Sequence, residues 1–168
     1  MVRKRNKQTM NQIHPTVILG PNVILEDDIY IGPYCIIGFP PEWKGKENEN
    51  KGVIIRSGTR ITGMVTIDGG AITPTEIGEN CYIMKHAHIG HDAIIQNGVT
   101  ISCGAKVGGH SIICENSNIG LNAVIHQKCV IPEGCMIGAS AFVGKKSNLR
   151  AFHKYAGVPV KELGENKR

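Results

Sequence analysis

Large β-branched residues recur at every sixth position along most of this chain of 168 residues. In the twelve repeats that begin at residues 77 to 143, the position four residues after the large residue holds a small side chain, which is Cys, Ala, Ser or in one case Val. Ile and Val make up about a fifth of the chain, so an unbroken run of twelve arises by chance on the order of once in 10⁸ trials. The run consists of Ile77, Ile83, Ile89, Ile95, Ile101, Val107, Ile113, Ile119, Ile125, Ile131, Ile137 and Val143.

The same phase continues upstream, from residue 13 to 37 and again from 55 to 67. It breaks across residues 39–52 and 68–75, which we interpret as loops. A six-residue unit with one large and one small inward position predicts one side of a coil with corners, stacked on copies of itself. This hexapeptide-repeat pattern resembles the left-handed parallel β-helix family of acyltransferases. The resemblance implies an all-β, left-handed parallel β-helix of about seven triangular coils, with three units in each coil and two loop excursions.

Composition and charge support a single repeat domain. The chain holds 24 Ile and 12 Val against 5 Leu, a balance typical of strands rather than helices. The formal net charge is +5, but four basic residues lie within the first ten positions, where there is no acidic residue. Residues 11–168 are therefore close to neutral, and we expect no nucleic-acid partner. We predict a flexible basic tail over residues 1–10, the β-helix domain over 11–150 and a short C-terminal segment over 151–168.

The cysteines and the apolar runs indicate a cytoplasmic protein. No apolar run approaches the roughly 20 residues that cross a bilayer, and the basic start is not followed by an apolar stretch, so we expect neither a membrane span nor a secretory signal. The six cysteines form no C-x-x-C pair. Four of them occupy the small inward position, and we interpret these as structural thiols: Cys35, Cys81, Cys129 and Cys135.

One corner of the coil gathers the residues that could carry chemistry. If a coil takes eighteen residues, positions i and i+18 stack at about 4.8 Å. The corner at 90–92 then lies under 108–110, which lies under 126–128, and it holds three histidines on three layers. His91 lies beneath Gly109, which has no side chain to fill the space. A chance gathering of polar turn residues is the alternative, but the other two corners show no such cluster.

This set of residue types suits acyl transfer. An imidazole with a pKa of about 6.5 in its unperturbed state can accept a proton near neutral pH. A neighbouring carboxylate can orient the ring, and a backbone N–H at a bare glycine can bind the oxyanion of a tetrahedral intermediate. If the base activates the acceptor directly, no covalent nucleophile is needed.

The histidine-bearing segments resemble one branch of the family more closely. Residues 88–92 (HIGHD), 108–110 (GGH) and 124–127 (VIHQ), with 38–41 (GFPP) and 65–67 (VTI), follow the order and spacing of the UDP-N-acetylglucosamine O-acyltransferases of lipid A biosynthesis.

The resemblance implies a role for each matching residue. His91 is the general base that takes the proton from the sugar 3-hydroxyl, Asp92 supports the histidine network, and the Gly109 amide holds the oxyanion. The positions that contact or shape the donor and sugar sites are His88, His110, His126 and Gln127. The resemblance also implies a homotrimer with its site between subunits, no bound cofactor, and an acyl donor carried by acyl carrier protein.

Two departures leave the substrates open. The second loop, beginning Asp68-Gly69-Gly70-Ala71, lacks the basic residue usual in the family. We also expect no counterpart of the family's C-terminal helical domain. The ending from Tyr155 to Lys161 is instead similar to the tail of acetyl-CoA-dependent sugar acetyltransferases. The carrier, acyl carrier protein or coenzyme A, and the acylated atom, oxygen or nitrogen, therefore stay open.

Two other classes of function compete with acyl transfer. His86-x₄-His91 has the spacing of two zinc ligands in the γ-class carbonic anhydrases, but no third histidine stands two coils earlier, so we expect no metal. A non-catalytic scaffold is the second alternative.

Lys106 and Lys128 flank the histidine edge and could meet a phosphate. Trp43, in the long first loop, could cover a neighbour's cleft or the donor arm, or cap a bare edge of the coil.

Overall fold

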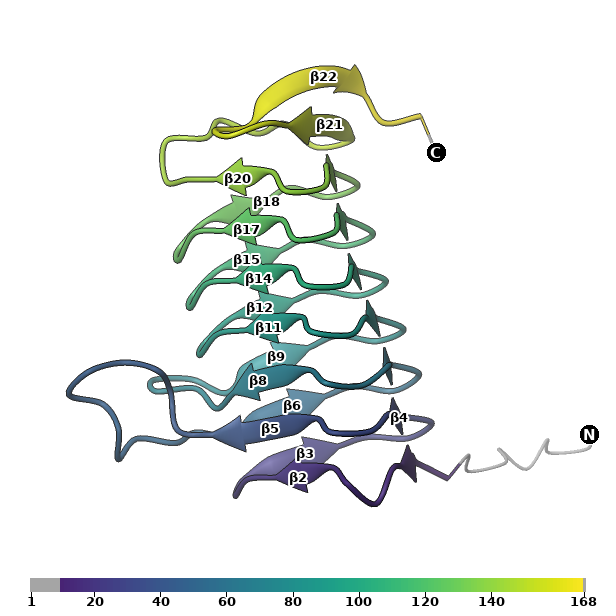
Figure 1. Ribbon diagram of the computed structural model, residues 1–168, viewed down its shortest axis with the longest axis vertical. Coiled ribbons are helices and arrows are strands. Elements are labelled where there is room, and N and C mark those ends of the chain that lie inside the picture. The colour runs from purple at the N-terminus through teal and green to yellow at the C-terminus, as the bar shows by residue number, and fades with distance from the viewer. Residues whose placement is uncertain (1–9, 168) are drawn as a thin grey trace, which may run out of the picture.

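The computed structural model describes residues 10–167, which form short strands joined by turns (Figure 1). The flexible tail predicted over residues 1–10 lies outside the described residues, apart from Met10. Within the described part of the chain, no helix is long and apolar enough to cross a membrane.

The strands stack into three sheets that form the sides of a prism, and all their pairings are parallel except that of the last two strands of the described chain. The nine-stranded sheet of residues 10–167 runs, in order, β1 (Gln12–Ile13), β4 (Tyr30–Ile31), β7 (Arg60–Ile61), β10 (Tyr82–Ile83), β13 (Thr100–Ile101), β16 (Asn118–Ile119), β19 (Met136–Ile137), β21 (His153–Ala156) and β22 (Lys161–Glu165). The seven-stranded sheet consists of β2 (Ile18–Leu19), β5 (Ile36–Phe39), β8 (Thr66–Asp68), β11 (His88–Ile89), β14 (Lys106–Val107), β17 (Val124–Ile125) and β20 (Phe142–Val143). The six-stranded sheet consists of β3 (Val23–Leu25), β6 (Val53–Ile55), β9 (Thr75–Ile77), β12 (Ile94–Ile95), β15 (Ile112–Ile113) and β18 (Val130–Ile131).

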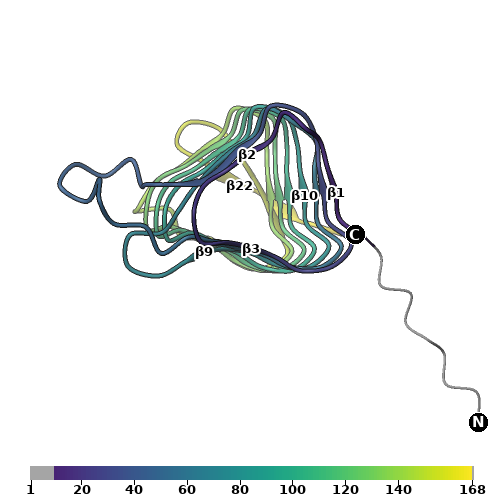
Figure 2. The ribbon, with the colours of Figure 1, turned by 90° about the horizontal axis from the view of Figure 1, so that it is seen from below.

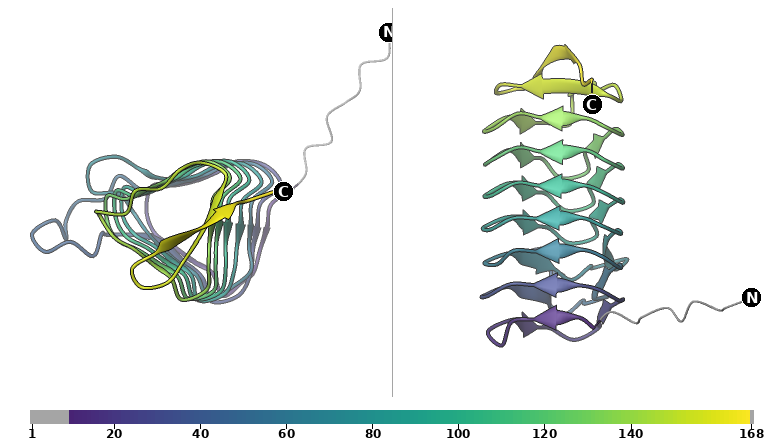
Figure 3. Two further views of the ribbon diagram at one scale, coloured as in Figure 1. Left: turned by 90° about the horizontal axis from the view of Figure 1, so that it is seen from above. Right: turned by 90° about the vertical axis from the view of Figure 1, so that its right-hand side faces the viewer.

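The coil is triangular and left-handed. Seen from the N-terminal end, the chain passes from β1 through β2 to β3 counter-clockwise while it recedes from the viewer (Figure 2). Successive strands of each sheet lie directly over one another (Figure 3), and the pairings His88↔Lys106 and Lys106↔Val124 show a register of eighteen residues. The predicted left-handed β-helix is therefore confirmed.

The six-residue period fills the interior of the coil. All twelve Ile and Val side chains of the run from 77 to 143 are at most 1% exposed. The four cysteines at small inward positions are also buried, and burial raises the pKa of each thiol, so the thiolate that would act as a nucleophile is disfavoured. These cysteines pack as small apolar residues inside the coil.

Both loops leave the prism at the same corner. They follow β5 and β8, two neighbouring strands of the seven-stranded sheet, and project together from one edge (Figure 1). At the other end of the domain, β21 continues the nine-stranded sheet in parallel with β19, and β22 returns antiparallel across the end of the coil (Figure 3). The residues after 150 thus add to the repeat stack.

Candidate active site

The corner between the seven-stranded and six-stranded sheets stacks three layers, at 90–92, 108–110 and 126–128. The N–H of His110 donates to the carbonyl of His91 at 2.9 Å, and the N–H of Lys128 donates to the carbonyl of Gly109 at 2.9 Å. Asp92, His110 and Lys128 share one backbone position, with φ of 57°, 57° and 62°. The register therefore carries one turn conformation through three coils and places their side chains on one edge.

His91 and Asp92 form a buried hydrogen-bonded pair. Nδ1 of His91 lies 2.8 Å from Oδ2 of Asp92, and the two side chains are 11% and 2% exposed. An ionised carboxylate can only accept a hydrogen bond, so Nδ1 carries the proton and Nε2 of the neutral ring is the free acceptor. His91 thus has the tautomer that a general base needs.

The second loop holds Asp92 in its charged form. The N–H groups of Ala71, Ile72 and Thr73 donate to its two carboxylate oxygens at 2.9, 2.8 and 2.7 Å. Burial opposes ionisation, but the hydrogen bonds from these N–H groups and from the His91 ring outweigh it and lower the pKa of Asp92 to about 2. The Asp92 N–H in turn donates to Oγ1 of Thr75 at 2.9 Å.

Gly109 leaves room for the His91 ring. A Cβ atom at Gly109 would lie 2.6 Å from Nε2 of His91, so any side chain here collides with the ring. Within residues 10–167, the Gly109 N–H donates no hydrogen bond. A free donor therefore stands beside the nitrogen that can accept a proton.

A pocket of about 340 Å³ opens beside His91, which is one of its lining residues. Its remaining walls are Gln127, Lys128, His110 and residues 42–44 of the first loop. Burial, the largest effect, lowers the pKa of His110, and the charge of Asp92 acts in the opposite direction. His110 is therefore neutral at pH 7 and can donate or accept a hydrogen bond in the pocket.

His88 lies outside this pocket, on the outer face of the seven-stranded sheet. Its Nδ1 is 2.8 Å from Oγ1 of Thr66, and its Nε2 is 3.7 Å from Oδ2 of Asp68. That carboxylate oxygen is buried and has no hydrogen-bond partner within residues 10–167. Burial raises the pKa of Asp68, and the neighbouring His88 ring acts in the opposite direction.

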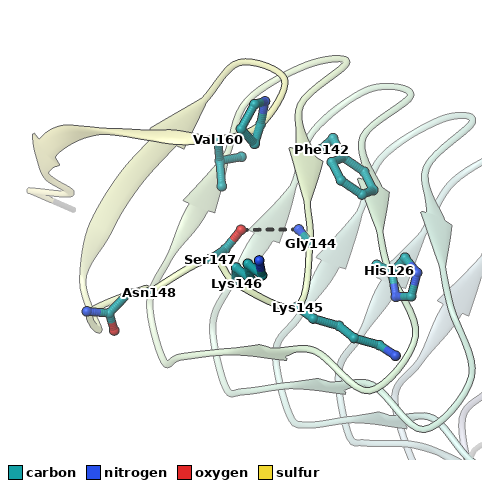
Figure 4. A pocket seen from close by; sticks show the side chains of 9 residues that line it. His126, Phe142, Gly144, Lys145, Lys146, Ser147, Asn148 and Val160 are labelled. Carbon is teal, nitrogen blue, oxygen red and sulfur yellow. Dashed lines mark hydrogen bonds between the residues drawn. The ribbon is translucent and has the colours of Figure 1, made fainter.

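His126 shares the corner but opens onto a different pocket (Figure 4). Its ring is 6.4 Å from that of Phe142, and Nδ1 lies 3.1 Å from the carbonyl oxygen of Gln127. The pocket, about 530 Å³, has an apolar floor that includes Phe142 and Val160, with Lys145 and Lys146 among its lining residues. Of the predicted site residues, the structure brings together His91, Asp92, Gly109, His110 and Gln127, and it separates His88 and His126 from them.

One of the two lysines was placed wrongly from the sequence. Nζ of Lys106 donates to the carbonyls of His86 and Gly104 at 2.7 and 2.8 Å, in the turns that precede β11 and β14 and so at the opposite corner from the histidines. A long side chain on the outer face can turn to either corner, which the repeat does not specify. Lys128 does line the pocket of His91.

The chemistry of the cluster fits a hydrogen-bonded pair better than a metal centre. One ligand atom from each of His91, Asp92 and His110 lies within 4.8 Å of the others, a spacing that would allow an ion. The Asp92 oxygens, however, already accept three backbone N–H groups and the His91 ring, and an ion would have to displace these donors. His86 and His91 stand at opposite ends of β11 and do not form a joint ligand pair.

Sequence reasoning did not identify the role of the two loops. Trp43 of the first loop stacks on His91 with ring centroids 5.2 Å apart, and the second loop supplies the N–H groups that bind Asp92. A signal was present, because both breaks in the period fall at the phase of the histidine corner, one and two coils earlier.

Comparison with known proteins agrees with this architecture. The family described as bacterial transferase hexapeptide (six repeats) matches residues 74–109. The match agrees with the six-residue period of the sequence and with the coils of the structure. It is 30% identical over 140 residues to the acyl-[acyl-carrier-protein]–UDP-N-acetylglucosamine O-acyltransferase of Thermodesulfovibrio yellowstonii, an alignment that covers 60% of this chain and 54% of that protein. Over 83 residues it is 39% identical to the enzyme of the same name from Campylobacter lari, which covers 47% of this chain and 32% of that protein.

Solved structures extend the likeness over nearly the whole repeat. The UDP-N-acetylglucosamine acyltransferase of Bacteroides fragilis superposes with a TM-score of 0.88 and 26% identity, covering 93% of this chain and 61% of that one. A perosamine N-acetyltransferase variant from Caulobacter crescentus, solved with CoA and GDP-perosamine, shares the fold with a TM-score of 0.64 and 19% identity, covering 94% and 58%. The resemblance stated from the sequence is confirmed, and the chain spans about half the length of the first of these relatives.

Proposed function

We propose that the protein is an acyltransferase that moves an acyl group from a thioester to a hydroxyl of a nucleotide-linked sugar. The observation that carries this proposal is the buried His91–Asp92 pair, whose free Nε2 faces Gly109 beside an open pocket. The proteins that match this chain along the same repeat are named as UDP-N-acetylglucosamine O-acyltransferases, which supports that acceptor and a donor on acyl carrier protein.

The proposed reaction uses the residues of the pocket in a single addition and elimination. Nε2 of His91 takes the proton of the acceptor hydroxyl while the oxygen attacks the thioester carbonyl carbon. The Gly109 N–H donates to the oxyanion that forms on the carbonyl oxygen. The C–S bond then breaks, the carbonyl re-forms, and the departing thiolate takes the proton held by His91. Asp92 balances the charge of the imidazolium in between.

The remaining predicted residues fit supporting roles. His110, Gln127 and Lys128 line the pocket and would bind the sugar or the donor. We propose that His88 and His126 contact more distant parts of the two substrates, because each lies on a surface adjoining the pocket. A homotrimer with its site between subunits is supported by the outer face of the six-stranded sheet, where five of the six strands present an apolar side chain and β9 presents Glu76. The five are Ile24, Ile54, Ile94, Ile112 and Val130.

An acetyl-CoA-dependent sugar acetyltransferase is the second candidate. It is favoured by the pocket beside His126, which combines apolar walls with Lys145 and Lys146 and could take a phosphate-bearing carrier (Figure 4).

The test is a transfer assay on the purified chain. Thermal-shift screening against UDP-N-acetylglucosamine, other nucleotide sugars, coenzyme A and acyl carrier protein first identifies ligands of the native state. Thiol release is then followed with acyl carrier protein and coenzyme A thioesters. We expect His91→Asn to lower kcat at least 10²-fold and the matched variant His86→Asn, at an exposed turn, to leave it unchanged. Equal activity of His91→Asn and the wild type would refute the proposal.

A further inference from the structure

The only tryptophan of the chain lies against the proposed base. The Trp43 and His91 rings stack with centroids 5.2 Å apart and an interplanar angle of 26°. Both rings also meet His110 edge-on, at 5.6 Å from Trp43 and 4.9 Å from His91. The three rings therefore form a closed cluster at the mouth of the pocket.

The loop that carries Trp43 is tied to the body of the coil. The backbone N–H of Trp43 donates to the carbonyl of Pro41 at 2.7 Å, and the backbone carbonyl of Trp43 accepts a hydrogen bond from the Lys46 N–H at 2.9 Å. Two turns of the main chain therefore flank the residue that carries the indole. At the base of the loop, the Asn50 side chain donates to the carbonyl of Gly38 at 2.9 Å, and the Gly69 N–H donates to the carbonyl of Phe39 at 2.7 Å. These hydrogen bonds within the loop and at its base therefore fix the backbone that places the indole.

These contacts restrain the His91 ring on three sides. Asp92 binds Nδ1, Gly109 lies beside Nε2, and Trp43 covers one face. The π face of an indole attracts a cation more strongly than other aromatic rings do, and the attraction grows where water is excluded. Stacking on Trp43 therefore places an electron-rich face against the ring that would carry a positive charge after proton transfer.

We propose that Trp43 is a positioning residue for His91, a role that rests on the proposed function of His91 as the general base. The indole holds the imidazole in the orientation that joins Asp92 to the pocket. It also stabilises the positive charge that the ring gains when it takes the proton of the acceptor. A large aromatic ring in the first loop is needed for this role.

The first test uses the fluorescence of Trp43, which has no other indole to mask it. A protonated imidazole in contact with an indole quenches its emission, so the emission of the wild type should fall as the pH decreases from 8 to 5. We expect His91→Asn to remove most of this fall, and His88→Asn, at a histidine outside the ring cluster, to retain it. The same fall in His91→Asn as in the wild type would refute the coupling between the rings, whatever the activity.

The second test separates positioning from packing. Trp43→Leu should lower kcat about five-fold and move the acidic limb of the pH–rate profile to lower pH, because the imidazolium loses its aromatic partner. Trp43→Phe should keep most of the wild-type kcat and the position of the acidic limb. Lys46→Ala, in the same loop, should change neither kcat nor the pH profile. A Trp43→Leu variant with a lower Tm but an unchanged kcat and pH profile would overturn the proposal. No transfer with any donor, together with an emission change that depends on His91, would refute the proposed function and leave the coupling standing.

Discussion

Nδ1 of His91 and Oδ2 of Asp92 lie 2.8 Å apart, although both residues stand in one tight turn of the coil. The contact depends on the second loop, whose N–H groups at residues 71–73 fix the carboxylate from one coil below. The turn supplies the two side chains, and the hydrogen bonds from the second loop fix the orientation of the carboxylate toward the imidazole.

Asp92→Asn should lower the free energy of unfolding at pH 6 by about 1–3 kcal/mol, because an amide accepts the loop N–H groups less well than a carboxylate does. The pKa of Asp92 is depressed to about 2 in the folded state, against about 3.9 in the unfolded chain. The advantage of the wild type is therefore complete above about pH 4 and is lost as the pH falls toward 2. Urea unfolding across this range measures it, with Asp27→Asn, at an exposed position, as the control. If the free energies of unfolding of wild type and Asp92→Asn differed by the same amount from pH 6 down to pH 2, the proposed role of the Asp92 charge would be contradicted.

Gly109→Ala should push the His91 ring out of its place, since the new Cβ would lie 2.6 Å from Nε2. We expect a loss of activity as large as that of His91→Ala and a destabilisation of about 1–3 kcal/mol. Because the clash is with a side chain, the double variant Gly109→Ala/His91→Ala should be more stable than Gly109→Ala alone. Additive changes in stability would show that the two residues are not in contact.

Asp68→Asn should stabilise the fold at pH 7. The buried Oδ2 has no hydrogen-bond partner among residues 10–167, and burial raises the pKa of Asp68, so the folded state pays for ionisation above that pKa. Replacement by a neutral amide should raise the free energy of unfolding at pH 7 by less than about 2 kcal/mol, with the gain shrinking toward pH 4. Urea unfolding at the two pH values is the measurement, and a loss of stability at pH 7 would be the opposite result.

Ala123→Leu should be strongly destabilising, while Val124→Leu should not. Ala123 is fully buried at the small inward position, and Val124, the next residue, is 41% exposed on the outer face. Adding a large side chain inside a filled coil costs about 1–3 kcal/mol, whereas an added methylene on the surface costs little. Thermal unfolding of the two variants compares them directly, and similar Tm values would argue against the inward position of residue 123.

Much of the fold was predictable because every coil is built from the same six-residue sequence repeat. The large and small inward positions recur every six residues, and the family resemblance implies three such units in each coil. With that eighteen-residue register, counting placed His91 and His110 at one corner. The same reasoning placed His91 beneath Gly109, where the ring is found.

Side-chain directions on the outside of the coil were less predictable. Lys106 turns to the carbonyls of His86 and Gly104, and His126 adjoins Phe142 and a second pocket. An outward side chain has several rotamers of similar energy, and contacts with neighbouring coils select among them. A repeat fixes where such a residue stands and leaves open where its polar atoms point.

The sequence by itself determined the six-residue repeat and its inward positions, because large and small side chains that alternate in this way can be buried only inside a stacked coil. With the eighteen-residue coil that the family resemblance implies, it also determined the edge on which the imidazoles gather. Only the tertiary structure decided how that edge is completed. The two loops carry no period, so their paths depend on contacts with coils already formed, and these contacts bring Trp43 onto His91 and the N–H groups of residues 71–73 onto Asp92.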